Sequence, residues 1–147
     1  MVANHFNSKG GDDPLFGHRQ PPQFPSETQR HKQATIVNDF VADLEAANPR
    51  ANVVVLGDLN DFDFSRTLDI LEGDELVNLM DLLPLQERYS YVYEGNSEVL
   101  DQILVSRPLL QGHPEYDSVH VNAEFADQAS DHDPQVARLH VLGPASP

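Results

Sequence analysis

Hydrophobic and polar positions first divide the chain into a long helix and a set of strands. Residues 26–48 carry apolar side chains at helical spacing and end at an Asn-Pro pair, which predicts one long helix. Ser26 and Gln29 have the spacing of a capping box at its start. A second, shorter helix is predicted over residues 65–71. The apolar stripe of the long helix consists of Ile36, Val37, Phe40, Val41 and Leu44.

The remaining apolar segments read as strands. Residues 53–56 are apolar at every position, which indicates a strand buried on both faces. Residues 76–83 are apolar without a clear period. Strands outnumber helices and several are consecutive, so we expect an α/β (α+β) fold with a mixed, mostly antiparallel sheet and helices packed on one face. Further strands are predicted over residues 2–6, 89–95 before a Gly-Asn turn, 99–106, 117–125 and 134–142.

Residues 8–25 form a long segment rich in glycine and proline, which predicts a loop inside an otherwise single domain spanning residues 1–147. Two acidic side chains in it, Asp12 and Asp13, suit either a structural cation or a flexible acidic loop. Lys9 lies in this loop and Arg30 in the helix that follows, where a solvent-facing position is the simplest interpretation of Arg30.

Composition limits the classes of partner and cofactor. The 147 residues include 9 basic and 24 acidic side chains, for a formal net charge of −15, so net charge does not attract nucleic acid. Divalent cations or a local basic patch would have to mediate contact with a polyanion. The chain has no cysteine, which excludes disulfides and thiolate zinc sites. No apolar stretch reaches membrane-spanning length, and the start lacks the pattern of a signal peptide.

Four short stretches carry candidate chemistry, each at or near the end of a predicted strand. In order they are NHF, GDLND, LDQILVS and SDHDP. Strand ends are where α/β proteins gather their sites. Any one stretch alone is more simply a polar turn or a satisfied buried carboxylate. Their joint occurrence favours a site. The other histidines stand outside such motifs and receive no role: His18, His31, His113, His120 and His140.

The residue types in these stretches suit phosphoryl chemistry. Asp58 and Asp131 offer the oxygen ligands that Mg²⁺, Mn²⁺ or Ca²⁺ prefer. His132 titrates near neutral pH and can exchange protons with a reacting group. Asp101, polar within an apolar strand, is a natural partner that would fix its tautomer. Hydrolysis of a phosphoester needs a cation for the oxyanion and a base for water.

Asn60 and His5 complete the candidate set. Asn60 cannot change its charge, so we expect it to orient a phosphate oxygen or the attacking water, and its amide oxygen can join Asp58 at a cation. His5 offers a second proton donor or a phosphate contact.

The four stretches, in this order, resemble the endonuclease/exonuclease/phosphatase superfamily with its deoxyribonuclease I-like fold. Within it the chain is similar to the bacterial extracellular nuclease branch, where NHF-SKGG, YSY-Y-G, LD-ILVS and SDHDP occur together. The resemblance implies a catalytic histidine at His132, oriented by Asp101. It implies that Asp58 holds or activates the attacking water and can touch metal. The remaining implied roles are scissile-phosphate stabilisation by Asn60, metal ligation by Asp131 and phosphate contact by His5. Many relatives carry histidine where this chain has Gln102.

The resemblance covers only the C-terminal part of the family domain. It therefore implies half of a four-layer α/β sandwich, with the family's metal-binding glutamate and a further asparagine upstream. A half-sandwich exposes an apolar sheet face, so we expect a missing N-terminal half or a homodimer mate to cover it. The parent protein is expected to be secreted, without membrane attachment.

The expected function is a Mg²⁺-dependent phosphodiesterase, most directly a nuclease that hydrolyses DNA or RNA, with activity impaired in this chain. Two alternatives remain. One is a phosphatase or phospholipid phosphodiesterase of the same fold, and the other is an inert fragment that lacks a complete site.

Overall fold

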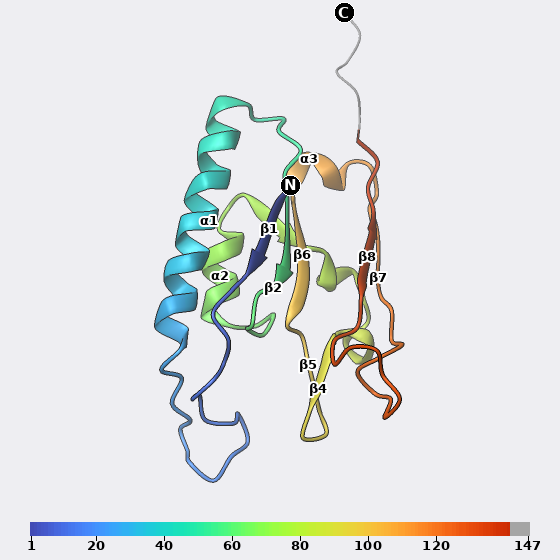
Figure 1. Cartoon of the computed structure of the whole chain (residues 1–147). Helices are drawn as coiled ribbons and strands as arrows, with labels where there is room; N and C mark the ends of the chain where they lie inside the picture. Colours follow the sequence, from blue (N-terminus) through green and yellow to red (C-terminus); the bar gives the residue numbers. More distant parts are fainter. Residues whose placement is uncertain (142–147) are drawn as a thin grey trace, which may run out of the picture.

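The computed structural model describes residues 1–141, and its centre is a four-stranded sheet in the order β1-β2-β6-β3 (Figure 1). β1 (Val2–His5) runs parallel to β2 (Val54–Asp58). β6 (Asp101–Ser106) is antiparallel both to β2 and to β3 (Leu76–Asn78). The sheet is therefore mixed and mostly antiparallel, as predicted.

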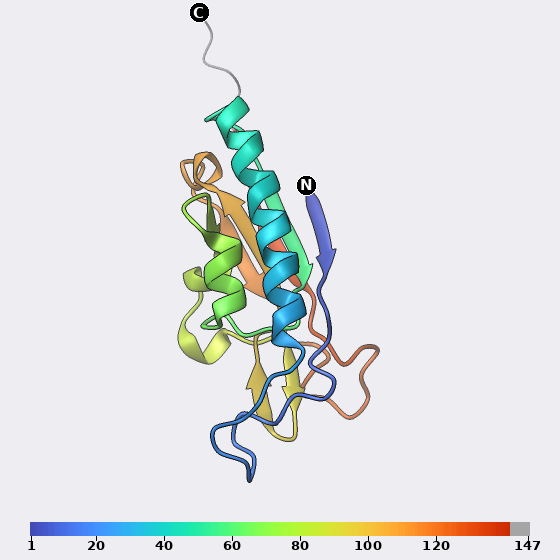
Figure 2. The same ribbon diagram turned by 90° about the vertical axis from the view of Figure 1, so that its left-hand side faces the viewer.

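Two helices cover one face of this sheet, which confirms the predicted arrangement (Figure 2). They are α1 (Glu27–Ala47) and α2 (Arg66–Glu72), and they pack against each other. Ser65 caps α2 by accepting a hydrogen bond from the backbone of Leu68. The core between helices and sheet contains Phe6, Ala34, Val41, Val53, Val55, Leu59, Leu68, Leu71, Leu76 and Leu104.

A pair of strands, β7 (Glu115–Ser118) and β8 (Gln135–Arg138), lies on the opposite side of the sheet (Figure 1). The second core lies here and includes Leu79, Met80, Val99, Ile103, Val105, Leu109 and Tyr116. Two short helical segments contribute to it, η1 (Leu79–Leu82) and α3 (Arg107–Leu110), and η2 (Leu85–Glu87) follows η1 in the chain. The segment 76–83 is thus a strand followed by a 3-10 turn. Among the residues described, no helix combines the length and apolar character needed to cross a membrane.

A small hairpin projects from the end of the sheet where the candidate site lies (Figure 1). Its strands are β4 (Tyr91–Tyr93) and β5 (Asn96–Glu98), with Tyr93 paired to Asn96. The two connecting residues, Glu94 and Gly95, have φ of 49° and 82°, as a tight hairpin turn requires. The predicted Gly-Asn turn is therefore wrong by one residue, because Asn96 already belongs to β5.

Two expectations for α1 are wrong. Ser26 makes no capping hydrogen bond, because its backbone is already helical and its hydroxyl bonds to other side chains. The buried stripe is also rotated from the predicted one: Arg30, Ala34 and Val41 are buried. Of the predicted stripe, Ile36, Phe40 and Leu44 lie exposed. Because Arg30 is buried, the face of α1 that packs inward differs from the face that hydrophobic spacing predicts.

The strand predicted over residues 117–125 is also wrong beyond Ser118. The backbone N–H groups of Val121, Asn122 and Ala123 all donate to one carboxylate oxygen of Asp133. Donors that converge on one side chain cannot form a ladder, so the segment turns. The predicted last strand is short and ends at Arg138, and its position 142 lies outside the described residues. Residues 8–25 contain neither helix nor strand, as predicted.

Candidate active site

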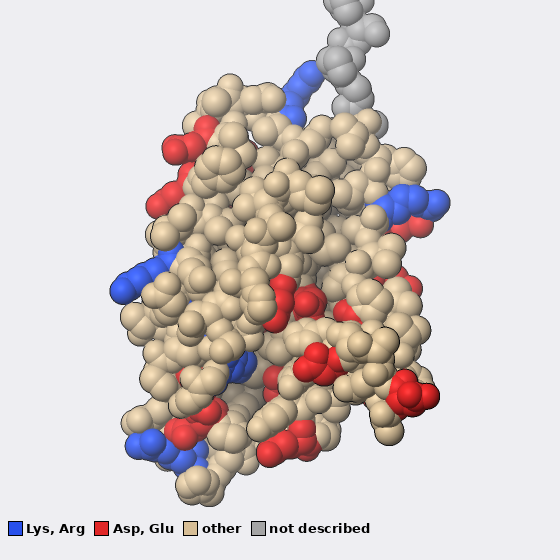
Figure 3. Space-filling view, viewed as in Figure 1, with Lys and Arg blue, Asp and Glu red and all other residues tan. Residues whose placement is uncertain are grey.

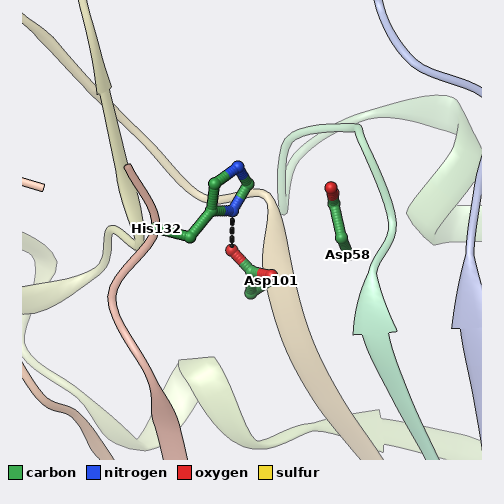
Figure 4. Close-up of side chains that lie close together, drawn as sticks. All are labelled: Asp58, Asp101 and His132. Atoms are coloured by element: carbon green, nitrogen blue, oxygen red, sulfur yellow. Dashed lines mark hydrogen bonds and ion pairs between the residues drawn. The ribbon is translucent and has the colours of Figure 1, made fainter. Parts of the chain in front are cut away.

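His132 and Asp101 form the centre of the site (Figure 4). Nδ1 of His132 lies 2.5 Å from Oδ2 of Asp101, although the residues are 31 positions apart. Asp101 begins β6, and His132 precedes β8 and forms an isolated bridge with Tyr91. The backbone N–H of Asp133 donates to the carbonyl of Ser90 over 2.7 Å, which anchors the SDHDP turn against the hairpin. The pairing of His132 with Asp101 was expected from the sequence.

Asp58 stands opposite Asp101 across two paired strands. It is the last residue of β2, and the antiparallel register pairs it directly with Asp101. One ligand atom each from Asp58, Asp101 and His132 lies within 4.8 Å of the others. Figure 4 shows the three side chains converging from separate strands and loops. The fold therefore gathers three of the predicted site residues into one cluster.

His5 reaches Asp58 from the neighbouring strand. The parallel register of β1 and β2 pairs the two residues, and Nε2 of His5 lies 3.4 Å from Oδ2 of Asp58. The His5 side chain is 77% exposed, so it borders the cluster from the solvent side. The chain passes unusually close here: a Cβ on Gly57 would lie 1.9 Å from the carbonyl oxygen of Asn4.

Asn60 is held in a turn just behind Asp58. Its backbone N–H donates to Oδ1 of Asp58 over 2.9 Å, and its φ is 50°. Its side-chain amide donates to the carbonyl of Phe6 over 3.0 Å. This bond uses one of the two amide N–H donors, and Asn60 shares the lining of a groove with His132. The second N–H is the group that fits the predicted orienting role toward a phosphate oxygen.

Asp131 stands apart from this arrangement. It is exposed, and among the described residues the three-membered ligand cluster does not include it. Its charge is nevertheless close enough to raise the pKa of His132. Its predicted metal ligation therefore stays a prediction.

Burial and neighbouring charges tune the two reactive groups. Burial raises the pKa of Asp58, and the charge of Asp101 adds to this, while the Asn60 hydrogen bond opposes it. Burial alone would lower the pKa of His132. The hydrogen bond and charge of Asp101, together with the charges of Asp58 and Asp131, outweigh it, so the pKa of His132 lies above its usual value.

The donor set fits a hard divalent cation. Asp58 and Asp101 provide carboxylate oxygens a few ångströms apart, and like-charged carboxylates at this distance are stabilised by a shared cation. Because Asp101 is hydrogen-bonded to His132, Asp58 is the carboxylate of the cluster best placed to hold such a cation. Ligation by Asn60 and Asp131 stays a prediction.

A buried ion-pair network lies directly beneath the site and was not anticipated. Asp61, the second carboxylate of GDLND, accepts from Nε of Arg30 at 2.8 Å and from the hydroxyl of Thr67 at 2.6 Å. Lys9 adds a contact at 3.3 Å. Burial opposes ionisation, but these donors lower the pKa of Asp61 overall. Arg30 is only 1% exposed, so its predicted solvent-facing position is wrong.

The same arginine fixes the long loop. Its Nη2 donates to Oδ2 of Asp12 over 3.1 Å, and Ser26 bonds to both residues. Asp12 is therefore part of a buried ion pair rather than of a flexible acidic loop. The Ser-Glu-Thr-Gln-Arg start of the helix offered no signal for this, because an arginine in a first turn is normally exposed.

Two further polar residues have structural partners. His120 stacks on Tyr89 with ring centroids 3.8 Å apart and bonds to Asp133 at 3.1 Å. Gln102 donates to the carbonyl of Asp61 and accepts from Asn78. Both side chains thus bond to segments that carry site residues.

Comparison with known proteins gives a consistent result. The Endonuclease/Exonuclease/phosphatase family matches residues 1–133. Truncated TDP2 from Caenorhabditis elegans aligns with a TM-score of 0.66 at 19% identity, over 95% of this chain and 53% of that one. A mannosyl-6-phosphatase from Bacteroides thetaiotaomicron aligns with a TM-score of 0.58 at 18% identity, over 80% and 48%.

A third solved structure is similar. Beta toxin from Staphylococcus aureus, determined with bound magnesium ions, aligns with a TM-score of 0.56 at 17% identity, over 92% of this chain and 51% of that one. The chain thus spans about half the length of these structures. No curated protein matches it. The match of residues 1–133 covers most of the sequence, and the chain belongs to the Endonuclease/Exonuclease/phosphatase family.

Proposed function

We propose that this chain carries the hydrolytic half of a metal-dependent phosphodiesterase, and that its substrate is a nucleic acid, DNA in the first place. The observation that carries the proposal is the convergence of Asp58, Asp101 and His132 at the end of the sheet. A carboxylate-oriented imidazole beside a second carboxylate suits proton transfer during hydrolysis of a phosphoester.

The hydrogen bonds divide the roles. Nδ1 of His132 faces Asp101, so the proton on Nδ1 is held there and Nε2 is left to exchange a proton with water or with the leaving oxygen. Asp58 lies on the other side and would position the attacking water. Asn60 would hold a phosphate oxygen through the second N–H of its side-chain amide, because the carbonyl of Phe6 accepts only one of the two.

A divalent cation, when bound by Asp58 and Asp131, would offset the negative charge of the phosphate. Magnesium is the first choice, because the ligands are oxygens, and the magnesium ions of the similar beta toxin structure support it. Mn²⁺ or Ca²⁺ would suit the same oxygens. His5, exposed beside Asp58, is placed to contact the phosphate from the solvent side.

A second function has support of its own. The similarity to a mannosyl-6-phosphatase favours a phosphatase acting on phosphate monoesters or on phospholipid head groups. The groups that hold a phosphate and a cation would be the same, and only the surrounding groove would differ. Hydrolysis of plasmid DNA, bis(p-nitrophenyl) phosphate and p-nitrophenyl phosphate, measured side by side, separates the two.

The decisive test compares His132→Ala with His18→Ala, an exposed histidine outside the cluster. With Mg²⁺, we expect the unsubstituted chain and His18→Ala to hydrolyse bis(p-nitrophenyl) phosphate at a low rate, and His132→Ala to lose at least about 100-fold in that rate. EDTA should abolish the reaction. Equal rates for all three proteins would contradict the proposal. Absence of both activity and Mg²⁺ binding by calorimetry would favour the inert alternative.

We also propose that, in the complete protein, a further half-domain or a second copy of this chain packs against the face of the sheet that α1 and α2 do not cover. In Figure 3 the centre of the upper half of the view is free of charged side chains, which lie along its edges. Leu56 and Ile103 line a groove of about 410 Å³ between the sheet and the turn before β8. Sedimentation should show self-association of the chain alone. The resemblance to extracellular nucleases supports a secreted parent protein.

A further inference from the structure

A series of aromatic rings leads away from the catalytic histidine. The ring centroid of Tyr91 lies 4.8 Å from that of His132. The ring of Tyr93 follows at 6.4 Å from Tyr91, and the two tyrosine planes differ by only 11°. Alternate residues of β4 thus place both tyrosines on the same side of the hairpin. Their rings form a nearly parallel pair that begins at the reacting group.

A second aromatic pair lies near the two tyrosines. Phe62 and Phe64 follow the GDLND motif and stack with centroids 5.2 Å apart at 14°. Phe62 and Tyr93 both line two hollows, one of about 390 Å³ that contains His132 and one of about 450 Å³ farther out. The hollows also share Glu98 and two residues of the long loop. They are therefore continuous, and we call them the aromatic groove.

The apolar rings of the aromatic groove are available to a ligand. Phe64 is 71% exposed and Tyr93 48% exposed, and Phe16 of the long loop, which also lines the outer hollow, is 81% exposed. Large aromatic side chains that stay exposed beside an active site mark a binding surface. The volume of each hollow is in the range of small-molecule sites, which fits one flat ring system rather than a whole duplex.

Charge restricts what else the ligand can carry. Among the described residues, Lys9 is the only lysine or arginine lining the inner hollow, where its Nζ lies 4.1 Å from the centroid of the Phe62 ring. Asp13 and Glu98 line the same hollow. In the outer hollow, Arg88 is paired to Asp81 at 2.7 Å. Figure 3 shows acidic side chains gathered in the lower half of this face. Because Lys9 also contacts Asp61 and Arg88 is paired to Asp81, the hollows do not favour a dense array of phosphates.

We propose that the aromatic groove binds the unpaired nucleobases that flank the scissile phosphate, so that the substrate is a single strand. This inference rests on the proposed function and names its substrate class. Aromatic faces bind bases of any sequence by stacking, whereas in a duplex the base faces are already covered. Stacking also supplies affinity that does not depend on positive charge. This matters because the net charge of the chain is −15.

Binding without cleavage tests the proposal directly. Isothermal titration in EDTA compares an unlabelled single-stranded thymidine hexamer with a 12-base-pair duplex, on the parent, Tyr93→Leu and Phe64→Leu. Phe125→Leu is the control, because Phe125 is 51% exposed, close to the 48% of Tyr93, but lines neither hollow. We expect the hexamer to bind the parent at least about tenfold more tightly than the duplex, and each groove variant to lose about tenfold in affinity.

Two results would overturn the proposal: equal or tighter binding of the duplex by the parent, or unchanged hexamer affinity in both groove variants. The parent comparison does not depend on the folding of any variant. Circular dichroism of each variant ensures that a loss of affinity reflects the ring. Hydrolysis of bis(p-nitrophenyl) phosphate with Mg²⁺ reports on the catalytic cluster alone. Hydrolysis without tighter binding of the single strand would contradict this inference and leave the proposed function standing. Tighter binding of the single strand without hydrolysis would contradict the proposed function and leave this inference standing.

Discussion

Arg30 donates from Nε to Oδ2 of Asp61 over 2.8 Å, and both side chains are almost completely buried. The arginine also pairs with Asp12, so a single guanidinium joins the long loop, α1 and the motif that carries Asp58. A buried charge pair costs desolvation energy, and that cost is recovered only while every partner is present. The turn that carries Asp58 and Asn60 therefore depends on an arginine that is itself almost completely buried.

Arg30→Met is expected to lower the free energy of unfolding by about 3–5 kcal/mol, because two buried carboxylates lose their cation. Urea titration followed by circular dichroism measures the change. Arg66→Met is the control, since Arg66 is exposed and only 3.8 Å from an exposed Asp69, a pair worth less than about 1 kcal/mol. Similar stabilities for both variants would mean that the network contributes little.

Asp101→Asn is expected to reduce activity by about 100- to 10,000-fold and to shift the pH profile. Asp101 helps to raise the pKa of His132, so in the parent the base form appears, and the rate rises, above the usual histidine value near 6.5. Without that carboxylate, only the charges of Asp58 and Asp131 oppose the effect of burial, so the pKa of His132 falls and the rise moves to lower pH. Rates of bis(p-nitrophenyl) phosphate hydrolysis between pH 5 and 9 measure it. Asp117→Asn, an exposed control, should leave the profile unchanged.

Glu72→Gln is expected to stabilise the chain at pH 8. Burial, with the charges of Asp81, Asp69 and Asp63, raises the pKa of Glu72 to about 7. Between pH 4.5 and 7 the folded chain holds a proton that the unfolded chain releases, so stability falls as pH rises through this window.

The full shift corresponds to about 3 kcal/mol, and screening by water at this partly exposed side chain reduces the expected gain to about 1–2 kcal/mol. Thermal unfolding at pH 5 and pH 8 measures the gain, which should be present only at pH 8. Asp43→Asn, on the exposed side of α1, controls for the general benefit of removing negative charge. An equal gain in both variants would contradict a specific role for Glu72.

Gly57→Ala is expected to destabilise the chain by about 2–4 kcal/mol, because the new Cβ would meet the Asn4 carbonyl oxygen at 1.9 Å while φ is 136°. Displacement of β1 would also separate His5 from Asp58. Gly95→Ala shares the positive φ but meets nothing within 4 Å, so it should cost about 1 kcal/mol. Urea titration of both variants measures the difference, and a smaller cost at Gly57 would show that β1 moves freely.

The site was largely predictable because its residues occur in short motifs at strand ends. Asp58 follows a fully apolar run, and Asp101 interrupts another, so both were visible as polar exceptions in apolar surroundings. Their direct pairing in the antiparallel register then follows from the sheet. Arg30 and Asp61 were not predictable, because an arginine on a helix is normally solvated and only a tertiary partner makes its burial favourable.

The sequence by itself determined the two helices, the apolar strands, the four motifs and thereby the family, since these depend on local periodicity and residue type. Only the tertiary structure decided which face of α1 turns inward, how residues 119–125 wrap around Asp133 and which aromatic rings border His132. Those features depend on contacts between segments far apart in the chain, where a buried charge or a converging set of donors outweighs local preference.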